Sequence, residues 1–274
     1  MNKAEEHIAD IYMQYSEVNV ARYDDTFLKN TLQKRIEESG CGSVDEYLLL
    51  LTRNELESKI LVDSLQISYS SFFRNPLTYN ILGKLILPGL IDQKINSKNN
   101  QIRIWSAACA AGQEAYSIAM LFEELRKCNV NNHCYQIFAT DRDENQINMA
   151  KKGHYHVSAL DNVGLKMVNK WFRRLGEIYT VKTELKKHIE FSVFDLLDTT
   201  LSSPPSSIFG GFDIIFCANV LFYYKAPFRK IIMNKMAGAM ARGGFLITGE
   251  TEREILLSNN FREVYPRSAI FCLK

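Results

Sequence analysis

The stretch RIWSAACAAGQEAYSIAM, from Arg103 to Met120, carries the clearest structural signal in this sequence. Its first residues indicate a buried strand, and its last residues repeat apolar positions with the spacing of a helix. A run of very small residues joins the two and contains a single glycine, Gly112. A strand that turns tightly into a helix is typical of sheets that bind nucleotide-like ligands. The G-x-G-x-x-G pattern of dinucleotide enzymes is absent, which disfavours NAD.

Strands and helices continue to alternate after this stretch. YQIFATD, residues 135–141, indicates a second strand, and the helix behind it ends at Gly153. FDIIFCANVLFYY, residues 212–224, indicates a strand that runs into a loop, and GGFLITGE, residues 243–250, starts another strand. This rhythm predicts an α/β fold with a doubly wound, Rossmann-like parallel sheet. Two short β runs around a polar turn break the rhythm, and they predict a small antiparallel insertion at about 176–194.

The N-terminal part of the chain has a different character. FLKNTLQKRIEESG shows helical spacing and stops at Gly40, and Ser43 with Glu46 forms a candidate capping box for the next helix. No strand signal occurs before residue 67. The sequence therefore predicts an all-helical N-terminal domain over residues 1–66 and a single α/β domain over residues 67–274.

Composition excludes several classes of protein. The 274 residues carry a formal net charge of +2, which gives no support for nucleic-acid binding. Apolar runs are too short to cross a bilayer, and the N-terminus lacks the apolar segment of a signal peptide. We therefore expect a cytoplasmic protein without direct membrane insertion. The six cysteines show no CxxC pair, and His154 with His156 has no further ligand in sight, so we expect no metal site.

Polar groups follow four of the predicted strands. They are the turn Ala107–Glu114, Asp141, the pair Asp195–Leu196, and the segment CANVLFY at 217–223. In open α/β sheets such groups converge at the carboxyl edge, and an acid after the second strand commonly binds a ribose diol. We interpret the set as an S-adenosylmethionine pocket. The alternative is that Asp141 caps a helix and that the small residues serve packing alone.

Five segments then resemble one family, the CheR-type chemotaxis receptor methyltransferases, across almost the whole chain. They are SYSSFFRNP, IWSAACAAGQEAYSIAM, IFATDRDENQINMAKKGHY, FSVFDLLD and FDIIFCANVLFYY. The resemblance implies a helical N-terminal domain, a linker and an inserted β-subdomain. It also implies that S-adenosyl-L-methionine donates a methyl group to glutamate side chains on the cytoplasmic helices of chemoreceptors. The products would be a glutamate γ-methyl ester and S-adenosyl-L-homocysteine.

The resemblance also implies roles for particular residues. Arg74 and Tyr223 are expected to orient the substrate carboxylate. The positions expected to contact the cofactor are Ser68, Ser70, Arg74, Glu114, Asp141, Asp195, Leu196, Ala218 and Asn219.

The chain departs from the family pattern at several positions. Ala218 stands where the family usually has arginine, Ala115 replaces a proline, and Asp195 and Ser68 each replace an asparagine. The family's basic second helix is reduced to a few cations, of which Arg35 is one, and acids follow them.

Methyl transfer to a carboxylate requires no general base, because glutamate is already ionised at pH 7. The missing Ser-His-Asp or Cys-His set is therefore expected. Three alternative roles remain at this stage: a surface salt bridge for Arg74, a core aromatic for Tyr223, and a helix-dipole partner for Glu114. A family member that binds S-adenosylmethionine or a receptor without transferring methyl is the alternative that Ala218 suggests. A methyltransferase for RNA or a small molecule fits the charge and the FFR stretch less well.

Overall fold

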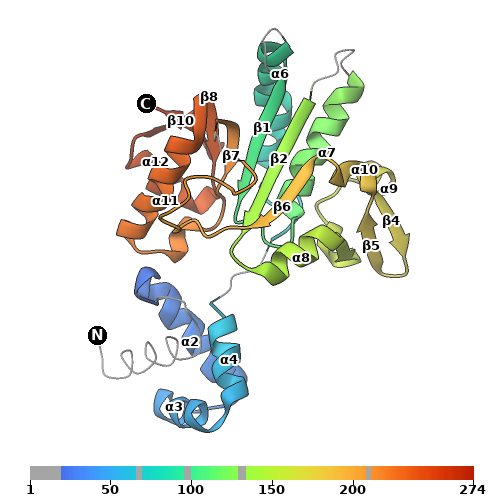
Figure 1. The fold of residues 1–274 in the computed structure, drawn as a ribbon. Coiled ribbons are helices and arrows are strands. Elements are labelled where there is room, and N and C mark those ends of the chain that lie inside the picture. The colour runs from blue at the N-terminus through green and yellow to red at the C-terminus, as the bar shows by residue number, and fades with distance from the viewer. Residues whose placement is uncertain (1–19, 66–69, 96–99, 129–133, 208–210) are drawn as a thin grey trace. The chain divides into compact units, whose positions relative to one another are not determined.

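The computed structural model describes residues 20–65, 70–95, 100–128, 134–207 and 211–274 (Figure 1). The chain forms two compact units. The helical unit comprises Met1–Ile67 and Phe222–Lys230, and the sheet unit comprises Ser68–Leu221 and Ile231–Lys274. The segment Phe222–Lys230 therefore packs with the N-terminal helices, although it lies inside the range 67–274 that the sequence assigned to the α/β domain.

The helical unit consists of short helices that begin at polar caps. Its elements within the described residues are η1 (Val20–Arg22), α2 (Asp25–Ser39), α3 (Val44–Arg53), α4 (Glu55–Asp63) and the start of α11 (Ala226–Ala239). Helix α2 ends at Gly40 in a left-handed conformation, φ 76°, as the sequence predicted. Ser43 caps α3 by accepting the N–H of Glu46, but the Glu46 carboxylate accepts the N–H of Gly42. Only half of the predicted capping box therefore forms.

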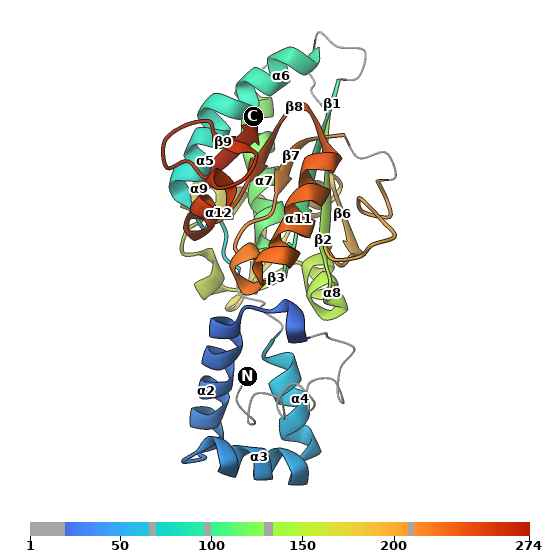
Figure 2. The same cartoon turned by 90° about the vertical axis from the view of Figure 1, so that its left-hand side faces the viewer.

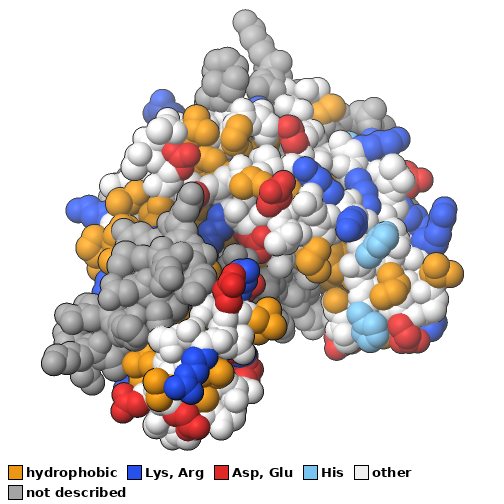
Figure 3. Space-filling view, turned by 60° about the horizontal axis from the view of Figure 1, so that its bottom comes forward, with side chains coloured by type: hydrophobic (Ala, Val, Ile, Leu, Met, Phe, Trp, Pro, Cys, Tyr) orange, Lys and Arg blue, Asp and Glu red, His pale blue; other side chains and the backbone are white. Residues whose placement is uncertain are grey.

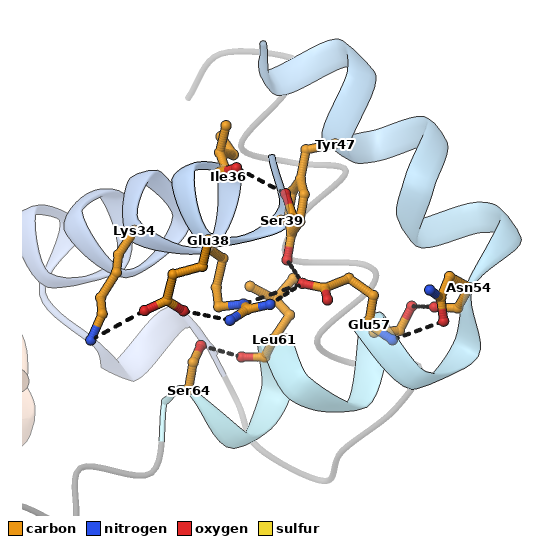
Figure 4. Close-up of polar contacts among 11 residues, drawn as sticks. Lys34, Ile36, Glu38, Ser39, Tyr47, Asn54, Glu57, Leu61 and Ser64 are labelled. Atoms are coloured by element: carbon orange, nitrogen blue, oxygen red, sulfur yellow. Dashed lines mark hydrogen bonds and ion pairs between the residues drawn. The ribbon is translucent and has the colours of Figure 1, made fainter. Parts of the chain in front are cut away.

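A buried carboxylate joins the three helices α2, α3 and α4 (Figure 4). Glu57 accepts hydrogen bonds from the Arg35 guanidinium at 2.7 and 3.2 Å and from the Tyr47 hydroxyl at 2.8 Å. Burial, and then the hydrogen bond to Glu57, raise the pKa of Tyr47. Arg35, which the sequence placed in the reduced basic helix, thus holds the unit together from inside and also pairs with Glu38.

The sheet unit is built on a seven-stranded sheet in the order β6-β2-β1-β7-β8-β10-β9. Its strands are β1 (Gln101–Ala107), β2 (Cys134–Asp141), β6 (Ile189–Val193), β7 (Phe212–Phe216), β8 (Met240–Ile247), β9 (Phe261–Glu263) and β10 (Ile270–Leu273). The first five are parallel, and β10 and β9 add an antiparallel edge. The order reverses between β1 and β7, which confirms the predicted doubly wound sheet and marks its switch point.

Helices cover both faces of this sheet. Ile104 points into a core shared with α5 (Pro76–Ile81), the π-helical turn η2 (Leu82–Ile86), α6 (Leu87–Ile95) and α7 (Gln113–Cys128); Figure 2 shows α5 and α6 on one side of the sheet. The neighbouring Trp105 points to the opposite face and packs on Phe194, over which α11 places Lys235. No described helix is both long and apolar enough to span a membrane.

A small antiparallel sheet projects from the sheet unit. Its strands, in the order β3-β5-β4, are β3 (His154–His156), β4 (Phe172–Leu175) and β5 (Ile178–Val181). The sequence placed this insertion at about 176–194. The structure instead starts it at His154 and gives β6 to the large sheet, because β6 pairs with β2.

Shorter helices connect the strands of the sheet unit. They are α8 (Glu144–Lys152), η3 (Val157–Leu160), α9 (Leu165–Trp171), α10 (Thr183–Lys186), η4 (Leu221–Tyr223, whose last two residues belong to the helical unit), η5 (Glu250–Glu252) and α12 (Arg253–Leu257). In Figure 3, histidine, apolar and cationic side chains lie together over the small antiparallel sheet, at the right of the view. Leu175, at the tip of its hairpin, is 82% exposed.

Candidate functional site

The carboxyl edge of the large sheet carries a strained turn. It lies at the lower edge in Figure 1, where β2 leads into α8. Between β1 and α7, Ala108, Ala110 and Gly112 all have positive φ, at 73°, 46° and 91°. A Cβ on Gly112 would lie 2.9 Å from the Ala150 Cβ of α8, so only glycine fits. The small residues thus let the chain reverse tightly against α8.

The backbone of this turn is bound within the protein. The N–H groups of Ala108 and Cys109 both donate to the Thr140 carbonyl at 2.8 Å, and the Gly112 N–H donates to the Cys109 carbonyl at 3.0 Å. The sequence suggested that small residues let these N–H groups approach a ligand. The structure shows that the N–H groups of Ala108, Cys109 and Gly112 fix the turn itself.

Asp141 stands at the end of β2 beside the turn. Its Oδ2 accepts the Ala110 N–H at 2.9 Å, and its Oδ1 accepts the Asp143 N–H at 3.0 Å. Asp143, not Asp141, caps α8 by accepting the Asn145 N–H. The capping alternative for Asp141 is therefore wrong. Burial raises the pKa of Asp141, and the two backbone donors oppose that rise.

Glu114 lies at the start of α7 on the same edge. The Ser106 hydroxyl of β1 donates to its Oε1 at 2.6 Å. Burial raises the pKa of Glu114 to about 7, while Ser106 and the positive charge of Arg74 lower it and Glu252 raises it. The structure therefore brings Arg74, Glu114 and Glu252 close enough to interact electrostatically.

The FFR stretch positions Arg74 through its two phenylalanines. Phe72 is fully buried and packs edge-to-face on Tyr155 and Phe172. Phe73 has positive φ, 49°, and its N–H donates to the Ser117 hydroxyl of α7 at 3.0 Å. Arg74 follows directly and is exposed. Ser70 is partly buried at the start of this described segment, and Ser68 lies outside the described residues.

The pair Asp195–Leu196 follows β6 next to Asp141. The Phe194 N–H donates to the Asp141 carbonyl at 2.9 Å, so the two strand ends remain in register. Asp195 is partly buried and accepts the Leu197 N–H at 2.9 Å. Leu196 is buried. This pair and Asp141 thus occupy one end of the site.

Ala218 and Asn219 follow β7. The backbone from Asn219 to Leu221 is hydrogen-bonded to Glu252, a residue that the sequence analysis missed. Glu252 is completely buried, and its carboxylate accepts the backbone N–H groups of Asn219, Val220, Leu221 and Gly249 at 2.6 to 2.7 Å. Asn219 is left-handed, φ 62°. Burial raises the pKa of Glu252, and the four donors oppose that rise. The sequence signal for this role was weak: an acid three residues after Gly249, just before a helical pattern.

Tyr223 belongs to the helical unit. Its ring packs edge-to-face on Phe27 with centroids 5.0 Å apart, and its carbonyl accepts the Asp24 N–H at 2.8 Å. The other predicted site residues that the structure describes belong to the sheet unit.

The chain is similar in sequence to methyltransferases of chemotaxis. A family model described as CheR methyltransferase, SAM binding domain, matches residues 68–268. A chemotaxis protein methyltransferase of Borreliella burgdorferi is 29% identical over 238 residues, which cover 86% of this chain and 82% of that protein. Chemotaxis protein methyltransferase 1 of Pseudomonas aeruginosa is 30% identical over 242 residues, covering 86% and 85%. That of Salmonella typhimurium is 26% identical over 262 residues, covering 93% and 84%.

Proposed function

Because the chain belongs to the CheR methyltransferase family and is an S-adenosylmethionine-dependent methyltransferase of chemotaxis, we propose that it methylates glutamate side chains of chemoreceptors. The product would be a glutamate γ-methyl ester. The observation that supports the proposal is that Arg74 lies close enough to Glu114 to lower its pKa, while Glu114 and Asp141 follow the adjacent strands β1 and β2. In this set, Arg74 would bind a carboxylate, Glu114 an ammonium group and Asp141 a diol.

The residues at this edge fit S-adenosylmethionine. A partly buried acid with a pKa near 7 favours a cationic neighbour, because a nearby positive charge stabilises the ionised carboxylate. Glu114 would therefore hold the ammonium group of the cofactor. Asp141 keeps lone pairs free beyond its two backbone donors and would accept the ribose hydroxyls. Asp195 and Leu196 would flank the adenine.

The bound cofactor supplies an electrophilic methyl group on a positively charged sulfur. The substrate glutamate presents an ionised carboxylate oxygen, since its ordinary pKa is about 4.3. An O–CH₃ bond forms as the S–CH₃ bond breaks, the sulfonium becomes a thioether, and the two opposite charges disappear without any proton transfer. The protein therefore has to align the two reactants and exclude water.

Arg74 is the residue that we assign to the substrate carboxylate. Its planar guanidinium can donate two parallel hydrogen bonds to a carboxylate, which fixes one lone pair toward the reacting methyl. Phe72 and Phe73 are both buried and the Phe73 N–H is bonded to Ser117, so the backbone just before the exposed Arg74 is held in place. We propose that Tyr223 also takes part in methyl transfer, as its match to the family's tyrosine implies.

The proposed partner is the cytoplasmic helical part of a chemoreceptor, which would place the protein in the cytoplasm. The test is transfer of tritiated methyl from S-adenosylmethionine to receptor-containing membranes. We expect a label on the receptor that alkali releases, because esters hydrolyse there. Cofactor binding without any transfer would contradict the proposal and favour the non-transferring alternative that Ala218 suggests. An alkali-stable label would also contradict it.

A further inference from the structure

We propose that Glu252 is a positioning residue that fixes the backbone of Asn219 at the cofactor edge of the sheet. The inference rests on the proposed function in one respect: it takes Asn219 as a cofactor-contacting residue. It goes further because it assigns a role to a residue from a different loop, the one that follows β8.

Asn219 adopts a conformation that its neighbours must maintain. Its φ of 62° lies in the left-handed region, which residues other than glycine enter uncommonly. In this region successive N–H groups can turn toward one point and form a concave anion site. Here the N–H groups of Asn219, Val220 and Leu221 all converge on one carboxylate. Glu252 thus supplies the anion that this concave backbone requires.

Each oxygen of the Glu252 carboxylate accepts two hydrogen bonds. Oε1 accepts from Val220 at 2.7 Å and Leu221 at 2.6 Å, and Oε2 accepts from Asn219 and Gly249, each at 2.7 Å. Since Glu252 is completely buried, no water can replace a lost partner without rearrangement. The loop after β7 and the loop after β8 are therefore locked to each other.

Gly249 completes the arrangement by leaving room for the Asn219 side chain. A Cβ at Gly249 would lie 2.5 Å from Asn219 Nδ2 and 2.9 Å from Glu252 Oε2. The φ of Gly249 is −68°, which any residue can adopt. The requirement for glycine at this position is thus the close approach of the Asn219 carboxamide, and Gly249 and Glu252 together fix both its backbone and its side chain.

The test compares Glu252→Gln with Glu263→Gln. Glu263 is a matched control in the same unit, because it is also largely buried and accepts from Arg253 and from the N–H groups of Arg267 and Ala269, none of which belongs to the Asn219 loop. In Glu252→Gln, the NH₂ group of the side chain would point at backbone N–H donors and could not accept their hydrogen bonds. We expect faster hydrogen–deuterium exchange at the four donors, the N–H groups of Asn219, Val220, Leu221 and Gly249, and binding of S-adenosylhomocysteine weaker by about tenfold or more. Glu263→Gln should change neither.

Equal effects of the two variants, or unchanged exchange and binding in Glu252→Gln, would overturn the inference. If Glu252→Gln does not fold, Glu252→Asp decides. It keeps the charge, but its shorter side chain cannot reach all four N–H groups, so S-adenosylhomocysteine binding should weaken by about tenfold; wild-type affinity would refute the role. None of these readouts uses a receptor. A wild-type protein that binds the cofactor without transferring methyl would therefore contradict the proposed function and leave this comparison intact.

Discussion

The Ser106 hydroxyl on β1 donates a 2.6 Å hydrogen bond to the Glu114 carboxylate at the start of α7. This bond favours the ionised acid, yet burial outweighs it and the pKa of Glu114 rises to about 7. The free protein therefore holds a carboxyl that is half protonated at neutral pH, at the position proposed for the cofactor's ammonium group.

Cofactor binding should depend on pH through Glu114. Below pH 7 the carboxyl is protonated in the free protein, and binding an ammonium group releases that proton, so affinity should fall by about tenfold for each pH unit. Above about pH 8 the cofactor's own amino group loses its charge. Calorimetric titration across this range should give a maximum between the two values. Glu114→Gln should remove the acidic limb; a wild-type affinity that stays flat below pH 7 would contradict the assignment.

Replacing Arg74 should abolish transfer and leave the fold intact. Arg74→Ala removes the group assigned to the substrate carboxylate, and we expect turnover to fall by about a hundredfold or more. Because Arg74 is exposed, the unfolding midpoint should change little. Methyl transfer to receptor membranes and thermal unfolding measure the two effects. Arg262→Ala, at another exposed arginine in the same unit, is the control. Full activity of Arg74→Ala would refute the proposed role.

Asp141 and its neighbour Asp143 offer a matched pair. Asp141→Asn removes the charged acceptor proposed for the ribose and should weaken S-adenosylhomocysteine binding by about tenfold to a hundredfold. Asp143→Asn leaves a good N-cap on α8 and should bind as the wild type does. Calorimetric titration with S-adenosylhomocysteine measures the affinity of each variant. Equal affinities for the two variants would show that Asp141 serves the turn and not the ligand.

Gly112→Ala should destabilise the sheet unit. The substitution adds a Cβ 2.9 Å from that of Ala150 at a residue whose φ is +91°. We expect the free energy of unfolding to fall by about 1 to 3 kcal/mol. Gly89→Ala is the control, because its Cβ would meet nothing within 4 Å inside helix α6. Denaturant unfolding should show it unchanged or slightly stabilised; a similar loss in both variants would count against the packing argument.

The sequence predicted the parallel sheet well because its signals are local. The apolar strand of Arg103, the tight turn and the amphipathic helix each depend on residues a few positions apart. The helix ends at Gly40 and Gly153 were equally clear, because glycine commonly ends a helix in the left-handed conformation that both residues adopt. The position of the small sheet was harder to predict, because pairing of β3 with β5 depends on residues about twenty positions apart.

The site was predictable only where a single segment carries it. Glu252 was missed because its partners, Asn219 to Leu221, lie more than thirty positions earlier and offer only backbone N–H groups. Likewise, no local pattern shows that Ala108 and Ala110 are left-handed, since alanine normally avoids that region. Tertiary packing decides both features.

The segment Phe222–Lys230 affects when the helical unit can fold during synthesis of the chain. Asp24 pairs with Arg229 at 3.3 Å, Asp25 with Lys225 at 2.7 Å, and the Tyr23 ring stacks on Tyr224. These partners leave the ribosome about two hundred residues apart, and domains generally fold in the order of their emergence. Tyr23, Asp24 and Asp25 can therefore finish packing only after Phe222–Lys230 has been made. A nascent chain that stops before Phe222 presents Tyr23 and its neighbours to chaperones in place of their own partner segment.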